Sequence, residues 1–92
     1  MAVRLSWEDG SGHLLQLRGK GIDGSPGGVR LETCQPIHIG TFVHVQVEQR
    51  GLAASGRVKQ CVRKGLRYDI GVAFTQTVPW KEDTAPTPTD AG

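Results

Sequence analysis

Short segments in which apolar and polar residues alternate recur along this chain, and turns containing glycine separate them. The clearest segment is TFVHVQVEQ, in which Val43, Val45 and Val47 fall on one side. Successive side chains of a β-strand point to opposite faces, so this period of two predicts a strand with one buried face. Such segments follow one another at roughly the 8–12-residue spacing typical of antiparallel barrels and sandwiches. They are residues 3–7, 13–22, 29–33, 41–49, 52–62 and 67–74.

This rhythm predicts an all-β fold, a six-stranded antiparallel β-barrel over residues 2–75. A chain of 92 residues is long enough for one small domain, and closing the sheet into a barrel removes exposed strand edges. In the fifth segment, Val58 and Val62 are the expected inward anchors. Residues 76–92 are rich in Pro and Thr and predict a flexible, disordered tail, with Trp80 folding back over an open end of the barrel. Glycines inside the segments mark expected bends or bulges; they are Gly19, Gly21, Gly56 and Gly71.

The charge of the chain is small but unevenly distributed. A formal net charge of +2 is too weak to indicate a polyanionic partner. Residues 57–67, RVKQCVRKGLR, nevertheless hold five basic residues and no acid. This segment either attracts a phosphate-bearing ligand or is a solvated outer face and hairpin tip. No signal-peptide pattern or apolar run of about 20 residues is present, so we expect a cytoplasmic protein without membrane insertion, in which Cys34 and Cys61 are reduced.

Catalytic and metal-binding patterns are weak. The serines lack a G-x-S-x-G turn, no glycine-rich phosphate loop opens a helix, and no acid stands obviously beside a histidine. A zinc site built from Cys34, His38, His44 and Cys61 would lack the close ligand pairs of structural zinc motifs. Binding of single-stranded nucleic acid needs exposed aromatic platforms, whereas most aromatics here fall on predicted inward faces. We therefore expect no enzyme activity, no metal, no cofactor and no DNA or RNA partner.

One loop sequence, IDGSPGGVRL at residues 22–31, has two interpretations. Gly and Pro favour tight turns, and Asp and Ser side chains bond nearby backbone amides, so the stretch predicts a turn between strands. The same residues also suit a ligand-binding loop, with Asp23 and Ser25 facing a partner and Gly28 letting it approach the backbone. Local chemistry alone favours the turn.

The order of motifs along residues 2–75 resembles that of PilZ domains. Asp23-x-Ser25-x-x-Gly28 matches the (Asp/Asn)-x-Ser-x-x-Gly motif of the family at every fixed position. Downstream, GVRLE matches the strand after that motif, and IGTFVHVQV matches a Gly followed by an alternating strand. ASGRV and IGVAF match the recurrent Gly-Arg-Val and the closing Gly-Val-x-Phe. The resemblance implies a six-stranded antiparallel barrel, in agreement with the strand count.

The resemblance also implies a ligand, cyclic di-GMP, a bacterial second messenger. Asp23, Ser25 and Gly28 take the loop positions that contact a guanine edge in the family. The Arg-x-x-x-Arg segment that clamps the ligand ahead of the first strand has no counterpart, because Glu8 follows Arg4 at that spacing. The residues that could partly replace this clamp are Arg18, Lys20, Arg30 and Arg57.

Two functions therefore remain open. The first is a regulatory domain that binds cyclic di-GMP weakly. The second is a degenerate PilZ adaptor that binds a protein, in motility or surface-attachment machinery, without nucleotide. The complete loop motif favours the first, and the absent arginine pair favours the second.

Overall fold

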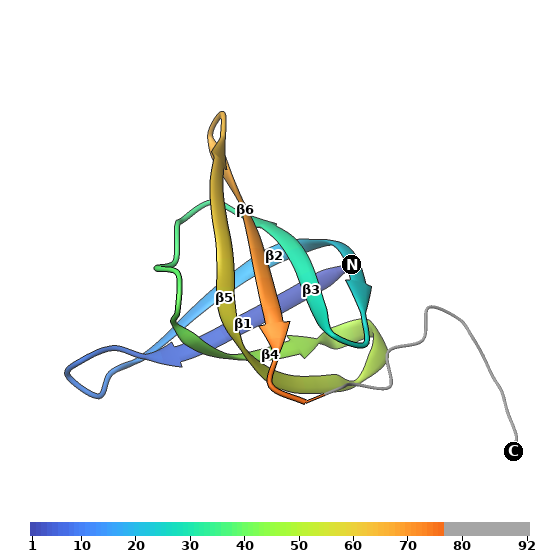
Figure 1. Ribbon diagram of the computed structural model, residues 1–92, viewed down its shortest axis with the longest axis horizontal. Coiled ribbons are helices and arrows are strands. Elements are labelled where there is room, and N and C mark those ends of the chain that lie inside the picture. The colour runs from blue at the N-terminus through green and yellow to red at the C-terminus, as the bar shows by residue number, and fades with distance from the viewer. Residues whose placement is uncertain (77–92) are drawn as a thin grey trace, which may run out of the picture.

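The computed structural model describes residues 1–76 as a closed barrel of six antiparallel strands, in the spatial order β1-β2-β3-β6-β5-β4 (Figure 1). The predicted six-stranded antiparallel barrel is confirmed. Apart from Gln76, the predicted flexible tail lies outside the described residues, as does Trp80. The elements are β1 (Ala2–Glu8), β2 (Leu14–Ser25), β3 (Gly28–Thr33), β4 (Phe42–Val47), the short 3-10 helix η1 (Glu48–Arg50), β5 (Leu52–Lys64) and β6 (Arg67–Phe74).

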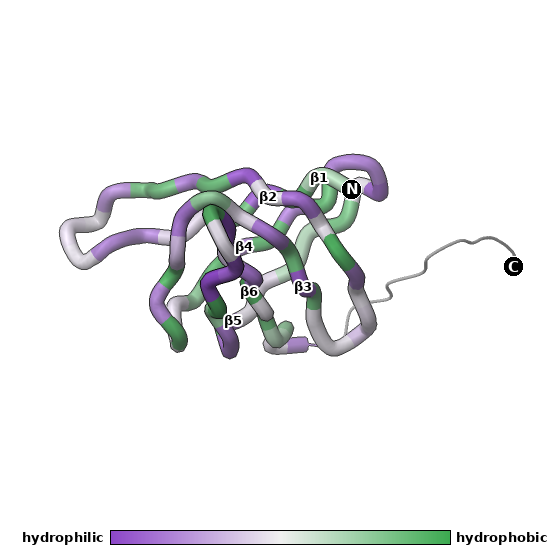
Figure 2. Tube along the Cα trace, turned by 90° about the horizontal axis from the view of Figure 1, so that it is seen from above, coloured by the Kyte–Doolittle hydropathy of each residue, from purple (hydrophilic) through white to green (hydrophobic). Residues whose placement is uncertain are grey.

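The alternating strands bury one face in the barrel interior. Figure 2 shows the change between hydrophobic and hydrophilic residues along the strands. In β4 the valines at 43, 45 and 47 are buried, while Phe42, His44 and Gln46 between them are exposed. Burying such an aliphatic side chain contributes about 1.5–3 kcal/mol to folding. The innermost side chains are Val3, Leu5, Leu31, Val43, Val45, Val47, Val58 and Ile70.

Two hairpins extend beyond the closed part of the barrel (Figure 1). In the first, β1 pairs with β4 only over Val3–Ser6, so the end of the β1–β2 hairpin lacks that neighbour. Leu14 there is 62% exposed. In the second, β5 pairs with β4 only as far as Arg57, and the β5–β6 hairpin continues to a turn at Gly65, whose φ is 64°.

A bulge in β5 overturns one prediction about the core. The register moves from Val58 opposite Val72 to Gln60 opposite Gly71, so Lys59 is an extra residue. An extra residue in a strand reverses which face the following side chains occupy. Cys61 consequently stands opposite Ile70 and packs against the core, and Val62 is 44% exposed. The prediction that Val62 faces inward was wrong.

The strand glycines have two different roles. Gly21 borders the second bulge, between β2 and β3, and Gly71 lies opposite the bulge in β5, as predicted. Gly19 and Gly56 border no register shift. A Cβ on Gly56 would instead lie 2.3 Å from the carbonyl oxygen of Ala73. These two positions need glycine because neighbouring atoms approach too closely for a side chain.

We predict that Gly56→Ala lowers the free energy of unfolding by about 1–3 kcal/mol, because the added methyl group meets backbone that cannot move aside easily. Gly10→Ala is the matched control, since a Cβ added there would meet nothing within 4 Å and the φ of Gly10 is not positive. Urea denaturation followed by tryptophan fluorescence measures both. Equal stabilities for the two variants would contradict the close approach of β5 and β6.

Candidate ligand-binding site

The residues of the loop motif lie on the hairpin between β2 and β3. Asp23 and Ser25 are at the end of β2, Gly28 begins β3, and Pro26 and Gly27 form the turn. Asp23 and Ser25 are exposed on the outside of the barrel. The predicted turn is confirmed, and it carries two accessible polar side chains.

Gly28 has a clear structural role. A Cβ at this position would lie 2.4 Å from the carbonyl oxygen of Val72 on β6. The neighbouring Gly27 carbonyl accepts a hydrogen bond from the Phe74 amide at 2.9 Å. The motif glycine thus lets β3 and β6 approach each other, which holds the loop against the last strand.

Arg30 stands directly beside Asp23. The two residues are opposite each other in the β2–β3 register, and the Arg30 Nη2 to Asp23 Oδ2 distance is 3.7 Å. Both side chains are largely solvent-accessible, at 46% and 67%. At this distance the pair is an ion pair longer than a hydrogen bond, so each group keeps donors or acceptors available to a third partner.

A buried carboxylate lies behind Arg30. The Asp69 side chain on β6 is 6% exposed, with Oδ1 at 3.7 Å from Arg30 Nε and Oδ2 at 3.4 Å from Lys64 Nζ. Its Oδ1 is buried without a hydrogen-bond partner. Asp69 was not among the residues predicted from the sequence, because alternation places it on the outside of the barrel between Tyr68 and Ile70. Asp69 is buried because it lies between β3 and β5, opposite Glu32 and Val62.

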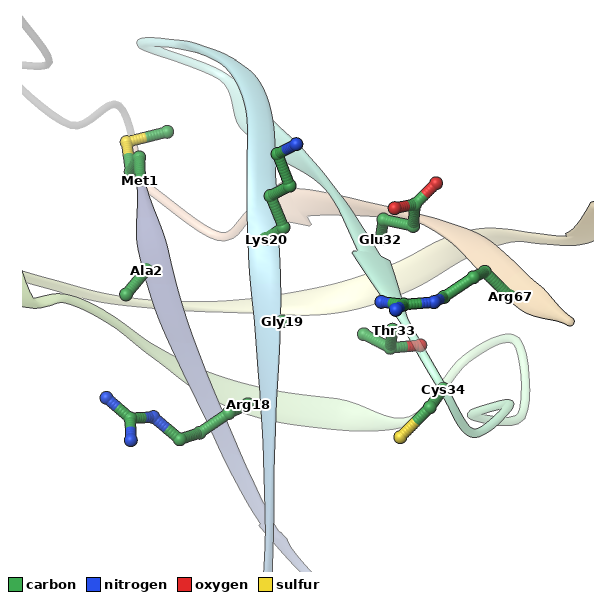
Figure 3. A pocket seen from close by; sticks show the side chains of 9 residues that line it. All are labelled: Met1, Ala2, Arg18, Gly19, Lys20, Glu32, Thr33, Cys34 and Arg67. Carbon is green, nitrogen blue, oxygen red and sulfur yellow. The ribbon is translucent and has the colours of Figure 1, made fainter.

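A shallow hollow of about 370 Å³ opens on the same outer surface, over β1, β2, β3 and the start of β6 (Figure 3). Its charged lining residues are Arg18 and Lys20 from β2, Glu32 from β3 and Arg67 from β6. Arg18 is already engaged, since its Nη2 lies 3.1 Å from Glu48 Oε1. Arg67 was not among the predicted site residues, because nothing in the sequence places position 67 beside position 20.

Arg57 lies on a different part of the barrel. Its guanidinium donates a hydrogen bond to the Gly40 carbonyl at 3.0 Å and sits 5.4 Å from the centre of the Phe42 ring. In the register Arg57 is opposite Ala73, which is opposite Gly28, so two strand spacings, roughly 10 Å, separate Arg57 from the motif. Of the seven predicted site residues, the structure brings Asp23, Ser25, Gly28 and Arg30 together at the β2–β3 hairpin. Lys20 and Arg18 lie farther along the outer face of β2, with Arg18 roughly 20 Å from Ser25, and Arg57 lies on β5.

The histidines and cysteines offer little metal chemistry. Within residues 1–76 no group of three His, Cys, Asp or Glu side chains is placed to hold a metal ion, and both cysteines are free. One expectation was wrong: Asp9 does stand beside a histidine, with Oδ2 at 3.7 Å from His13 Nδ1. This pair lies on the exposed β1–β2 turn, where Asp9 Oδ1 also accepts the amides of Ser11 and His13. Asp9 thus organises a turn.

The comparison with known families agrees with this geometry. The family model of the PilZ domain matches residues 1–81. The chain belongs to the PilZ family. PilZ domains are regulatory binding domains of cyclic di-GMP signalling and not enzymes. A search of curated proteins finds no match to the chain. No helix in the described part of this PilZ domain is long and apolar enough to cross a membrane.

We predict that Arg30→Met destabilises the domain by about 1–2 kcal/mol, because it leaves the buried Asp69 carboxylate with one cation. Asp23→Ala, at an exposed position, should change stability by less than about 0.5 kcal/mol. Adding Asp69→Asn to Arg30→Met should recover part of the loss. Urea denaturation measures all three. A double variant less stable than Arg30→Met would contradict the role given to the buried carboxylate.

Proposed function

We propose that this PilZ domain binds cyclic di-GMP on the outer faces of β2 and β3, and that it does so weakly. The observation that carries the proposal is the placement of Asp23, Ser25 and Arg30 together beside the hollow that contains Lys20. An acid, a hydroxyl and cations accessible on one surface suit a ligand that combines guanines with phosphodiesters.

The pair of Asp23 and Arg30 fits the edge of a guanine. Guanine presents the acceptors O6 and N7 next to N–H donors. A carboxylate accepts N–H groups, and a guanidinium fork donates to O6 and N7. Because the two side chains already lie 3.7 Å apart, one guanine could engage both without a large rearrangement.

Weak affinity follows from how few cations are available. Arg18 is held by Glu48, and Arg30 is shared between Asp23 and Asp69. Each charge-assisted contact that is absent costs about 1.5–3 kcal/mol. Two of them weaken binding by about a hundredfold or more. A domain that reads this messenger works in the bacterial cytoplasm and needs no catalytic activity.

A protein-binding adaptor is the second candidate function. It is favoured by a second hollow of about 410 Å³ between the β1–β2 hairpin and β4, where Leu14 is 62% and Phe42 41% exposed. Exposed apolar side chains around a concavity are typical of interaction surfaces. On this account the loop motif is a structural turn, and the partner belongs to motility or surface-attachment machinery.

We predict that cyclic di-GMP binds the native chain with roughly micromolar or poorer affinity, with the largest amide shifts at residues 22–30. Asp23→Ala should weaken binding by at least about tenfold, because it removes the acceptor for the guanine edge. Glu8→Ala, an exposed acid at the end of β1, is the control and should bind as the native chain does. The measurement is a two-dimensional amide titration. If no amide shifts at about 1 mM nucleotide, the adaptor function is favoured instead.

A second prediction concerns the missing arginine pair. The Met1 carbonyl accepts the Gly21 amide at 2.7 Å, so a segment attached ahead of Ala2 starts close to the loop motif. Grafting an Arg-x-x-x-Arg segment there should tighten binding by at least about tenfold, and Asp23→Ala should abolish the gain. A Gln-x-x-x-Gln graft is the matched control. Isothermal titration calorimetry measures each variant, and equal affinities for the two grafts would argue against phosphate or guanine contacts from this segment.

A further inference from the structure

Two cations face the hollow beside the loop motif without an acidic partner. Lys20 enters from β2, and Arg67 from the start of β6 extends across β3 toward it (Figure 3). Lys20 stands opposite Glu32 in the β2–β3 register, yet neither cation forms an ion pair within residues 1–76. Oppositely charged residues directly across two strands usually attract each other. Because Lys20 and Glu32 are nevertheless not within ion-pair distance, the charge of Lys20 remains available.

The other basic side chains of this surface are already neutralised. Arg18 is held by Glu48, and Lys64 is held by Asp69. Arg30 is shared between Asp23 and Asp69. An incoming anion must compete with carboxylates for each of these groups, whereas Lys20 and Arg67 require no such exchange. The hollow therefore concentrates its usable positive charge at these two residues.

We infer that Lys20 and Arg67 receive the phosphodiesters of the bound cyclic dinucleotide, and that Glu32 between them limits its affinity. This inference rests on the proposed function, since it names the residues that bind the rest of the same ligand. Lys20 precedes Asp23 by three residues on one strand, a separation of roughly 7–10 Å across the bulge, which a dinucleotide can span. Arg67, at the start of the last strand, thus supplies a guanidinium group. In the family motif, such groups come from arginines ahead of the first strand.

Glu32 gives the inference a second effect to measure, because its charge is opposite to that of Lys20 and Arg67. Its carboxylate lines the same hollow and would lie close to the negative phosphodiesters. Like charges at short range disfavour binding, and the effect is larger at a partly buried position such as this one. Neutralising Glu32 should accordingly strengthen binding, whereas neutralising Arg67 should weaken it. Unfolding of a variant cannot produce a gain in affinity, so the pair of opposite effects is informative.

The test measures cyclic di-GMP affinity for Arg67→Gln, Glu32→Gln and the matched control Arg63→Gln by amide titration. Arg63 is on the same hairpin, but it pairs with Tyr68 in the register while Arg67 pairs with Lys64, so the two arginines point to opposite faces. Each arginine variant removes the same charge. Arg67→Gln should weaken binding about three- to tenfold, Glu32→Gln should tighten it about two- to fivefold, and Arg63→Gln should stay within about twofold of native.

The outcomes separate the inference from the proposed function. If the native chain binds but Arg67→Gln binds as well as Arg63→Gln, or Glu32→Gln does not tighten binding, the inference is overturned and cyclic di-GMP binding stands. If the native chain shows no amide shift at about 1 mM nucleotide, the proposed function itself falls, and the inference falls with it. Opposite effects of Arg67→Gln and Glu32→Gln, with Arg63→Gln unchanged, support both.

Discussion

The pairing of β3 with β6 is the contact on which the rest of this structure depends. It joins a strand early in the chain to the last one, from Gly28 opposite Ala73 to Thr33 opposite Tyr68. The strands can meet there because Gly28 has no side chain that would strike the Val72 carbonyl. Closure of the barrel at this seam brings β6 alongside the loop motif. Without it, Asp69 would not lie behind Arg30, and Arg67 would not reach the hollow beside Lys20.

On the outer surface around β2 and β3, acids of β2, η1 and β6 balance the basic side chains. Asp23, Glu48 and Asp69 each hold at least one basic side chain. The exposed pairs of Asp23 and Glu48 contribute little to stability, about 0–1 kcal/mol each, but these acids compete with an anionic ligand for the same guanidinium groups. On the proposed function, these acids limit the affinity for the nucleotide, and a substitution that removes one of them would increase it.

The sequence could predict those features whose pattern lies within one short stretch of residues. The period of two and the glycine turns were enough for six strands, because each strand's own residues carry its pattern. The outward placement of Asp23 and Ser25 was also readable from the motif itself. The bulge at Lys59 was not, since one extra residue leaves the apolar spacing of Val58 and Val62 looking regular. The burial of Asp69 and the position of Arg67 at the hollow depend on strand register. The ion pair of Arg18 with Glu48 joins residues 30 positions apart. No short stretch of sequence records these contacts.

We propose that cyclic di-GMP occupies the outer surface of β2 and β3. The most direct measurement is a set of isotope-filtered nuclear Overhauser contacts between unlabelled nucleotide and carbon-13-labelled protein. We predict contacts from the nucleotide protons to the side chains of Lys20, Arg30 and Arg67. Contacts confined to Arg57 and Phe42 on the β4–β5 side of the barrel, or no contacts at a nucleotide concentration that saturates the amide shifts, would contradict it.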